Sequence, residues 1–265
     1  MEIGISTSTF YGKYTSDESL RVIGDLGVTL CEVFLSTFCE YSEEYAYELQ
    51  GIVEEYGLCV HSIHAMSTQF EPQLFASNLR QRADAYRILE DVLRVAQILG
   101  AEYYTFHGAL DLKRRTGKRD YAQLASHVES IADLCKHYGV CLAWENVHWC
   151  TYAHPGFAQE LLKHTDCLGF TLDIKQAAFS GHTTAEYIED MGKHLKNVHL
   201  CDYTLKDGLR ARPIGQGECD FHELKHLLQG AGYTGPGILE LYGENYHDPR
   251  ELTDSIRYLE DVFNG

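Results

Sequence analysis

Short apolar runs alternate with longer segments of helical period along the whole chain, and this alternation restricts the fold more than any other feature of the sequence. Runs rich in apolar and β-branched residues predict strands, whereas longer segments with amphipathic spacing predict helices. The predicted strands occupy residues 2–7, 30–35, 58–65, 101–108, 141–147, 168–174, 195–202 and 237–242. Eight strands that alternate with helices within 265 residues predict one closed (β/α)8 barrel, a TIM barrel that forms a single domain over residues 1–265.

The segments between the predicted strands have the features of helices. They include residues 42–57, 78–100, 120–139 and 221–232, several of which end at a glycine that suits a helix C-cap. The last helix is expected to begin with Asp248 as its N-cap and Pro249 in its first position. An open, doubly wound sheet is the alternative fold, but no Gly-x-Gly-x-x-Gly follows the first strand, where dinucleotide-binding versions carry it.

The charge of the chain argues against a nucleic-acid partner. Proteins that bind nucleic acids gain much of their affinity from lysine and arginine side chains that neutralise phosphates, and this chain has a net charge of −17. One basic segment, from Lys113 to Arg119, could contact an anion or could simply be a solvated loop.

Three further features place the chain among soluble proteins. Nine cysteines without a Cys-x-x-Cys pair indicate reduced thiols. The first residues lack a signal peptide, and no segment approaches the roughly 18 apolar residues of a membrane span. We therefore expect a cytoplasmic protein with no membrane partner. Its 18 tyrosines and 11 phenylalanines leave enough aromatic surface for a homo-oligomer, although core packing explains them equally well.

Residues that bind metals or transfer protons lie at the ends of most predicted strands, where TIM barrels carry their active sites. They are His61, His64, His107, Glu145, Asn146, Asp173, His199, Asp202 and Glu240. Each could also have a structural role, as a hydrogen-bonded histidine or as an acid that caps the next helix. Glu145 and Glu240, however, stand within apolar stretches, where a buried carboxylate needs a partner.

A divalent cation would be a common partner for these groups. We expect Glu145, Asp173, His199 and Glu240 to meet at the mouth of the barrel and to hold one metal ion. Three carboxylates and one imidazole suit Mn²⁺, Mg²⁺, Co²⁺ or Zn²⁺ better than a soft, thiolate-binding metal. The sequence leaves the choice among these ions open.

The segments at the strand ends resemble those of a known family. HSIHA, TFHG, WENV, TLDIKQA, NVHLCD and LELY, with the loop PIGQGECDF, are similar in kind and order to segments of the xylose isomerase-like barrels, which include sugar and sugar phosphate isomerases and epimerases. The resemblance implies that Glu145, Asp173, His199 and Glu240 correspond to the metal ligands of ketose 3-epimerases and inosose isomerases. It also implies that Glu145 and Glu240 move the substrate proton. Glu32 resembles an acid common at the end of strand two, and Gly215–Gly217 resembles a glycine loop that shapes the substrate mouth.

Four residues are candidates for substrate contacts. Gln176 stands where several sugar epimerases have a histidine, and its amide can still donate a hydrogen bond to a hydroxyl. We expect His64 and His107 to bind substrate or to support the metal ligands, although a structural role explains them equally well. Arg212, or its neighbour Arg210, could hold an anionic end of the substrate, and a solvated side chain is the alternative for each.

These residues predict an isomerase or epimerase that acts on a sugar or sugar phosphate. A carboxylate would remove a proton beside a carbonyl, and the metal would stabilise the enediolate. A dehydratase acting on an inosose or another polyol would use the same site, whereas a non-catalytic sugar-binding barrel would not need both glutamates. The resemblance extends to apurinic endonucleases of the endonuclease IV type, but Gln176 replaces one of their histidines and Leu209–Ala211 replaces their Asp-x-His.

Overall fold

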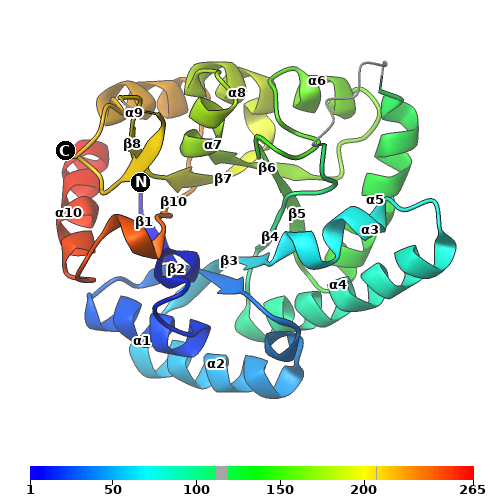
Figure 1. The fold of residues 1–265 in the computed structure, drawn as a ribbon, viewed down its shortest axis with the longest axis horizontal. Helices are drawn as coiled ribbons and strands as arrows, with labels where there is room; N and C mark the ends of the chain where they lie inside the picture. Colours follow the sequence, from blue (N-terminus) through cyan, green and yellow to red (C-terminus); the bar gives the residue numbers. More distant parts are fainter. Residues whose placement is uncertain (112–118, 207) are drawn as a thin grey trace.

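Eight parallel strands form a closed barrel in the computed structural model, which describes residues 1–111, 119–206 and 208–265. Their order around the barrel is β1-β10-β7-β6-β5-β4-β3-β2. The strands are β1 (Ile3–Ser6), β2 (Leu30–Leu35), β3 (Cys59–Ala65), β4 (Tyr103–Phe106), β5 (Cys141–Glu145), β6 (Gly169–Asp173), β7 (Leu195–Leu200) and β10 (Gly237–Leu239). Figure 1 shows the helices surrounding this barrel, and the predicted single-domain TIM barrel is confirmed.

The helices occupy the segments between and after the strands. They are α1 (Ser16–Asp25), α2 (Glu43–Tyr56), α3 (Glu71–Leu74), α4 (Leu79–Leu99), α5 (Tyr121–His137), α6 (Phe157–Leu162), α7 (Ile174–Phe179), α8 (Thr184–Met191), α9 (Phe221–Gly230) and α10 (Glu251–Asn264). Short 3-10 turns follow four of the strands: η1 (Thr7–Phe10), η2 (Phe38–Tyr41), η3 (Ser67–Gln69) and η5 (Gly243–Asn245). A fifth, η4 (Gly192–His194), connects α8 to β7. As the glycines predicted, α2 and α4 end at Gly57 and Gly100 in the left-handed conformation.

Seven of the eight strands are shorter than predicted, and β4 and β10 differ most from their predicted ranges. At the end of β4, the backbone N–H groups of His107 and Gly108 donate to the carboxylate of Glu71 instead of to a neighbouring strand. After β10, the N–H of Glu240 still donates to the carbonyl of Leu200, so the backbone pairing extends one residue past the strand. Both departures occur at the mouth of the barrel.

The start of the last helix was predicted incorrectly. α10 begins at Glu251 with Arg250 as its N-cap, and not at Pro249. The side chain of Asp248 accepts a hydrogen bond from the backbone N–H of Arg250, and the N–H of Glu251 bonds to the carbonyl of Asp248. This tight turn provides hydrogen-bond partners for the backbone N–H groups around Pro249 before α10 starts.

The outer layer supports the strand ends through a cluster of aromatic side chains. The indole of Trp144 in β5 lies with its ring centroid 5.1 Å from those of both Phe106 and Phe157. Its Nε1–H donates to the backbone carbonyl of His107 at 3.0 Å. Gly108 has φ of 79°, and a Cβ there would lie 2.6 Å from the indole. The core therefore fixes the direction in which the chain leaves β4.

Two expectations about the periphery can be compared with the structure only in part. No helix in the described ranges combines the length and the apolar composition needed to cross a membrane. Residues 113–118 of the basic segment lie outside the described ranges, so the anion contact stays a prediction. Arg119, which ends that segment, forms an ion pair with Asp111 at 2.9 Å.

Candidate metal centre

Four buried side chains from four adjacent strands meet at the mouth of the barrel. Glu145 ends β5, Asp173 ends β6, His199 lies in β7, and Glu240 directly follows β10. Each offers one ligand atom, and these four atoms lie within 4.8 Å of one another. The sequence gives these residues separations of 25 or more positions, and closure of the barrel brings them together.

Three buried atoms of this group have no hydrogen bond among the described residues. They are Oε2 of Glu145, Oδ2 of Asp173 and Nδ1 of His199. A buried polar atom without a hydrogen bond lowers the stability of a fold by about 1–3 kcal/mol. Such atoms are therefore usually bound to another group. Oxygen and imidazole ligands at this separation fit a divalent ion of the Mn²⁺, Co²⁺, Zn²⁺ or Mg²⁺ type.

The ring of His199 is held in one orientation by Glu32. Nε2 of His199 lies 3.1 Å from Oε2 of Glu32, and Nδ1 lies 3.5 Å from Oε1 of Glu145 and 3.3 Å from Oε2 of Glu240. Burial lowers the pKa of His199, but Glu32, Glu240 and Glu145 outweigh it and raise this pKa well above its usual value, so the metal-free ring is charged. A bound ion would displace the proton of Nδ1, whereas Nε2 would keep the proton that it donates to Glu32. The acid that the family resemblance noted on strand two therefore orients a candidate ligand.

Glu32 stays ionised in its fully buried position. Its carboxylate accepts hydrogen bonds from Ser62 at 2.6 Å and from Thr105 at 2.9 Å. Burial by itself raises the pKa of Glu32, but the positive charge and hydrogen bond of His199 outweigh it and lower the pKa to about 2. A permanent negative charge thus lies behind the His199 ring.

The three carboxylates of the ligand group differ in their surroundings. Burial raises the pKa of Asp173 to about 7, and the nearby Lys175 only partly opposes this. Burial also acts on Glu145, yet the pKa of this group is well below its usual value because His107 lies 2.7 Å away. The pKa of Glu240 is likewise lowered against the effect of burial, by His199 and Lys175. Both glutamates are therefore ionised at neutral pH.

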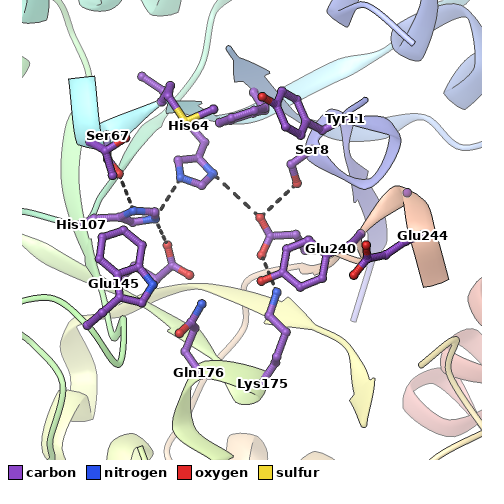
Figure 2. A pocket seen from close by; sticks show the side chains of 17 residues that line it. Ser8, Tyr11, His64, Ser67, His107, Glu145, Lys175, Gln176, Glu240 and Glu244 are labelled. Carbon is purple, nitrogen blue, oxygen red and sulfur yellow. Dashed lines mark hydrogen bonds and ion pairs between the residues drawn. The ribbon is translucent and has the colours of Figure 1, made fainter. Parts of the chain in front are cut away.

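A cavity of about 470 Å³ opens above the ligand group, which is within the usual size range of small-molecule sites. Figure 2 shows Glu145 and His107 on one side of it, Glu240 and Ser8 on the other, and Lys175 and Gln176 between them. Its walls also include the apolar or aromatic residues Tyr11, Phe34, Ala65, Met66, Trp149 and Tyr242.

His64 and His107 form a pair on one wall of this cavity. Their Nε2 atoms lie 2.9 Å apart, and Nδ1 of His107 lies 2.7 Å from Oγ of Ser67. Burial lowers the pKa of His107, but Glu145 more than offsets this and the pKa is raised. Burial and the charge of His107 lower the pKa of His64. The charged form is thus favoured for His107, beside Glu145, and the neutral form is favoured for His64.

Two further sets of ligand atoms lie within 4.8 Å of one another and share residues with the main group. One comprises His64, His107 and Glu145, and the other comprises Glu32, His64 and Glu240. In the first set, the proton between His107 and Glu145 already satisfies the contact at 2.7 Å. The main group has three buried atoms without a hydrogen bond among the described residues, whereas the first of these sets has two and the second has one.

Gln176, in the first turn of α7, has its amide oriented by a neighbouring loop. Its Oε1 accepts hydrogen bonds from the backbone N–H of His148 at 3.2 Å and from the ring Nδ1 of His148 at 2.6 Å. The amide nitrogen is therefore directed toward the cavity, as Figure 2 shows. His148, which the sequence did not indicate, stacks on Phe179 with ring centroids 4.9 Å apart.

Asp202 organises a loop and does not join the ligand group. Its carboxylate accepts hydrogen bonds from the backbone N–H groups of Gly215, Gly217 and Cys219 at 2.8 to 3.0 Å. A Cβ on Gly217 would lie 2.2 Å from Oδ1 of Asp202, so the loop needs glycine there. Asp202 follows β7 because its carboxylate holds this loop in place.

Two other candidates lie away from the cavity. Arg212 belongs to β9 (Arg210–Arg212), which pairs with β8 (Asp202–Thr204) in a hairpin, and is not among the described residues that line the cavity. His61 lies where the register of β3 shifts, with its ring centroid 4.9 Å from that of Tyr103.

Lys175 is a site residue that the sequence did not indicate. It lies in the first turn of α7, is 1% exposed, and places Nζ 3.5 Å from Oδ2 of Asp173 and 3.6 Å from Oε2 of Glu240. Nζ also lies 4.3 Å from the centre of the Tyr242 ring. In the sequence, Lys175 stands two positions after the strand-end aspartate. A lysine at such a position looks the same as any exposed lysine in a helix.

Comparisons with known proteins agree with this architecture. An uncharacterized protein of Mycobacterium leprae (strain TN) is 22% identical over 282 residues, which cover 97% of this chain and 96% of the relative. A solved D-tagatose 3-epimerase-like protein matches with a TM-score of 0.80 at 20% identity, covering 100% of this chain and 98% of its own. A D-psicose 3-epimerase from Clostridium cellulolyticum H10, solved with D-tagatose, matches with a TM-score of 0.80 at 17% identity and 99% coverage of both chains.

A third structure, an L-ribulose 3-epimerase, has a TM-score of 0.76 at 17% identity and covers 100% of this chain and 96% of its own. At these identities the structural matches establish a shared fold. The sequence model of the xylose isomerase-like TIM barrels matches residues 20–262, nearly the whole chain. The chain therefore belongs to the xylose isomerase-like TIM barrel family.

Proposed function

We propose that this protein is a divalent-metal-dependent sugar isomerase or epimerase that uses Glu145 and Glu240 to move a proton. The observation that carries the proposal is the group of four buried candidate ligands beneath a cavity of about 470 Å³, in which three atoms lack a hydrogen bond among the described residues. The solved epimerases with the same fold support the reaction class. A bound divalent ion would stabilise the negative charge that develops on substrate oxygens as a carbon-bound proton leaves.

The two glutamates have the properties of a pair of proton-transfer groups. Both line the cavity, and Figure 2 shows them on opposite sides of it. Both have lowered pKa values against the effect of burial, so both are carboxylates at neutral pH, which is the form a general base requires. A base on one side and an acid on the other side of a carbon allow its configuration to be inverted.

The surrounding residues would position the substrate and the glutamates. His107 holds Glu145 through the contact of 2.7 Å, and the hydroxyl of Ser8 donates to Glu240 at 3.0 Å. His64 and the amide of Gln176 line the cavity and can bind sugar hydroxyls. Trp149 and Tyr242 give it aromatic walls, which suit the apolar face of a sugar ring.

The cavity favours an unphosphorylated sugar. Among its described lining residues, Lys175 is the only lysine or arginine, and two carboxylates already neutralise it. Arg212 is not among them, so the expected contact with a phosphate has no support from the cavity. We therefore propose a neutral ketose or a similar sugar as substrate, with the dehydration of a polyol as the alternative outcome at the same site.

A substrate panel tests this proposal. Ketoses, their phosphates and inososes are incubated with the protein in Mn²⁺, Co²⁺, Mg²⁺ or Zn²⁺, and products are separated by chromatography. We expect turnover of an unphosphorylated sugar that EDTA abolishes, together with about one tightly bound ion per chain. Loss of water from the substrate would identify the dehydratase, and no turnover of any substrate with any ion would overturn the proposal.

Substitutions then test the proton transfer. Glu145→Gln and Glu240→Gln should each lower kcat by at least about 1,000-fold, because each removes a proton-transfer group and a ligand. Glu244→Gln is the matched control, since Glu244 lines the cavity but is exposed and lies outside the ligand group. Wild-type rates in both variants would show that the two glutamates do not carry the reaction.

A further inference from the structure

A positive charge, the ammonium of Lys175, lies beside the ligand group. The side chain is 1% exposed, and its Nζ lies 3.5 Å from Oδ2 of Asp173 and 3.6 Å from Oε2 of Glu240. A buried ammonium is costly unless it is paired, and here both partners are candidate metal ligands. Asp173 comes from β6 and Glu240 follows β10, so Lys175 bridges two strands across β7.

The ammonium faces oxygen atoms that a metal ion would use. Oδ2 of Asp173 has no hydrogen bond among the described residues, and Oε2 of Glu240 is the oxygen that lies 3.3 Å from Nδ1 of His199. Both atoms belong to side chains of the four-residue ligand group. A divalent ion bound there would lie close to Lys175, and two positive charges at such a distance repel each other strongly in a buried site.

A second contact allows Lys175 to remain beside a bound ion. Nζ lies 4.3 Å from the centre of the Tyr242 ring, on the side of the cavity. The face of an aromatic ring attracts a cation without using a carboxylate oxygen. Lys175 can thus keep a partner when Asp173 and Glu240 turn their oxygens to the ion.

Without a cation, the ligand group would be unstable. Glu145, Asp173 and Glu240 are all buried within ligand distance of one another, and like charges at this separation destabilise a fold. Lys175 offsets this repulsion in the metal-free protein. The same charge opposes the binding of the ion.

We propose that Lys175 is a built-in counter-cation of the metal site, which stabilises the metal-free barrel and weakens binding of the divalent ion so that the ion can be exchanged. This inference rests on the proposed function, because it requires the four ligands to bind metal. It assigns to Lys175 a role in metal affinity that is separate from catalysis.

Titration with Mn²⁺ tests the inference without a substrate. Lys175→Met keeps the length of the side chain and removes its charge, so the Kd for Mn²⁺ should fall by at least about tenfold. The Tm of the metal-free variant should fall below that of the wild type, and the rise in Tm on adding Mn²⁺ should be larger. Lys225→Met is the control, because Lys225 binds the carbonyl of Val262 and lies outside the cavity and the ligand group.

The outcomes separate this inference from the proposed function. Equal Kd values for the wild type and Lys175→Met would overturn the inference and leave the metal site intact. Binding by Lys175→Met alone would support the inference and remove metal dependence from the wild-type function. If neither protein binds Mn²⁺, the metal site is wrong, and the inference falls with it.

A kinetic measurement covers the case in which metal-free Lys175→Met does not fold. Both proteins are purified with Mn²⁺ and diluted into excess EDTA, and the release of the ion is followed. Slower release from the variant supports the inference, whereas equal or faster release contradicts it.

Discussion

Oε2 of Glu32 lies 3.1 Å from Nε2 of His199, on the side of the ring away from the ligand group. The carboxylate is fully buried, and the low pKa of Glu32, about 2, keeps it charged although burial opposes this. The pair therefore links a residue of β2 to one of β7 across the barrel. It fixes which nitrogen of His199 would keep its proton when an ion binds.

Neutralising Glu32 should weaken metal binding. In Glu32→Gln, the amide can bond to either state of the imidazole, so Nδ1 is no longer kept as the free nitrogen. We expect a Kd for Mn²⁺ about 10- to 100-fold higher than that of the wild type, measured by calorimetry. Glu102→Gln is the matched control, because Glu102 is exposed and precedes β4. An unchanged Kd in Glu32→Gln would mean that the pair is only structural.

The buried carboxyl of Glu71 should make stability depend on pH. It accepts hydrogen bonds from the hydroxyl of Tyr104 and from the backbone N–H groups of His107 and Gly108. Burial raises its pKa from 4.5 to about 7, and His107 and these hydrogen bonds oppose burial only in part. The folded protein therefore binds more protons than the unfolded chain between these two values.

The stabilising effect of this proton is complete below pH 4.5 and is lost as the pH rises through about 7. We expect the unfolding free energy of the wild type, relative to Glu71→Gln, to decrease with pH across this window by at most about 1.4 kcal/mol per pH unit. Urea unfolding in EDTA at several pH values measures the difference. A difference that stays constant with pH would contradict the raised pKa.

Gly217 should be essential to the loop at the mouth. A Cβ at this position would lie 2.2 Å from Oδ1 of Asp202 and 2.4 Å from the carbonyl oxygen of Tyr203. Gly217→Ala should therefore lower the unfolding free energy by about 1–3 kcal/mol, the usual cost of overpacking. Gly51→Ala, at an exposed position in α2 with no atom within 4 Å of the added Cβ, should raise it by about 0.5–1 kcal/mol. Similar effects in both variants would exclude the clash as the cause.

His148 should affect substrate affinity through Gln176. In His148→Phe the stacking on Phe179 is retained, but the hydrogen bond of 2.6 Å to Oε1 of Gln176 is lost. Once a substrate is known, we expect KM to rise about three- to tenfold with little change in kcat, because one hydrogen bond orients the amide. His137→Phe, at the exposed end of α5, is the control. A lower kcat with an unchanged KM would contradict this role.

The sequence indicated the fold and the ligand group because both leave local signals. Buried parallel strands appear as short apolar runs, and the mouth of the barrel is where such a run meets a charged residue, as at Glu145 and Asp173. Closure of the barrel then brings these ends together whatever the sequences of the helices between them.

Residues whose surroundings depend on the tertiary structure could not be predicted in this way. Lys175 follows a strand end by two positions and would be solvated in an isolated helix, but Glu240 and Tyr242 after β10 enclose it. Glu71 precedes a proline in a short helix, and its burial depends on the backbone that leaves β4. Arg212 was placed near the substrate because it precedes the glycine loop, yet the β8–β9 hairpin holds it elsewhere.

The candidate ligands Glu145, Asp173, His199 and Glu240 come from one continuous half of the barrel, β5, β6, β7 and β10, whereas Ser8, Glu32, His64 and His107 come from the other half. Libraries that vary the loops after β1, β3 and β4 would therefore reshape the cavity wall and leave all four candidate ligands in place.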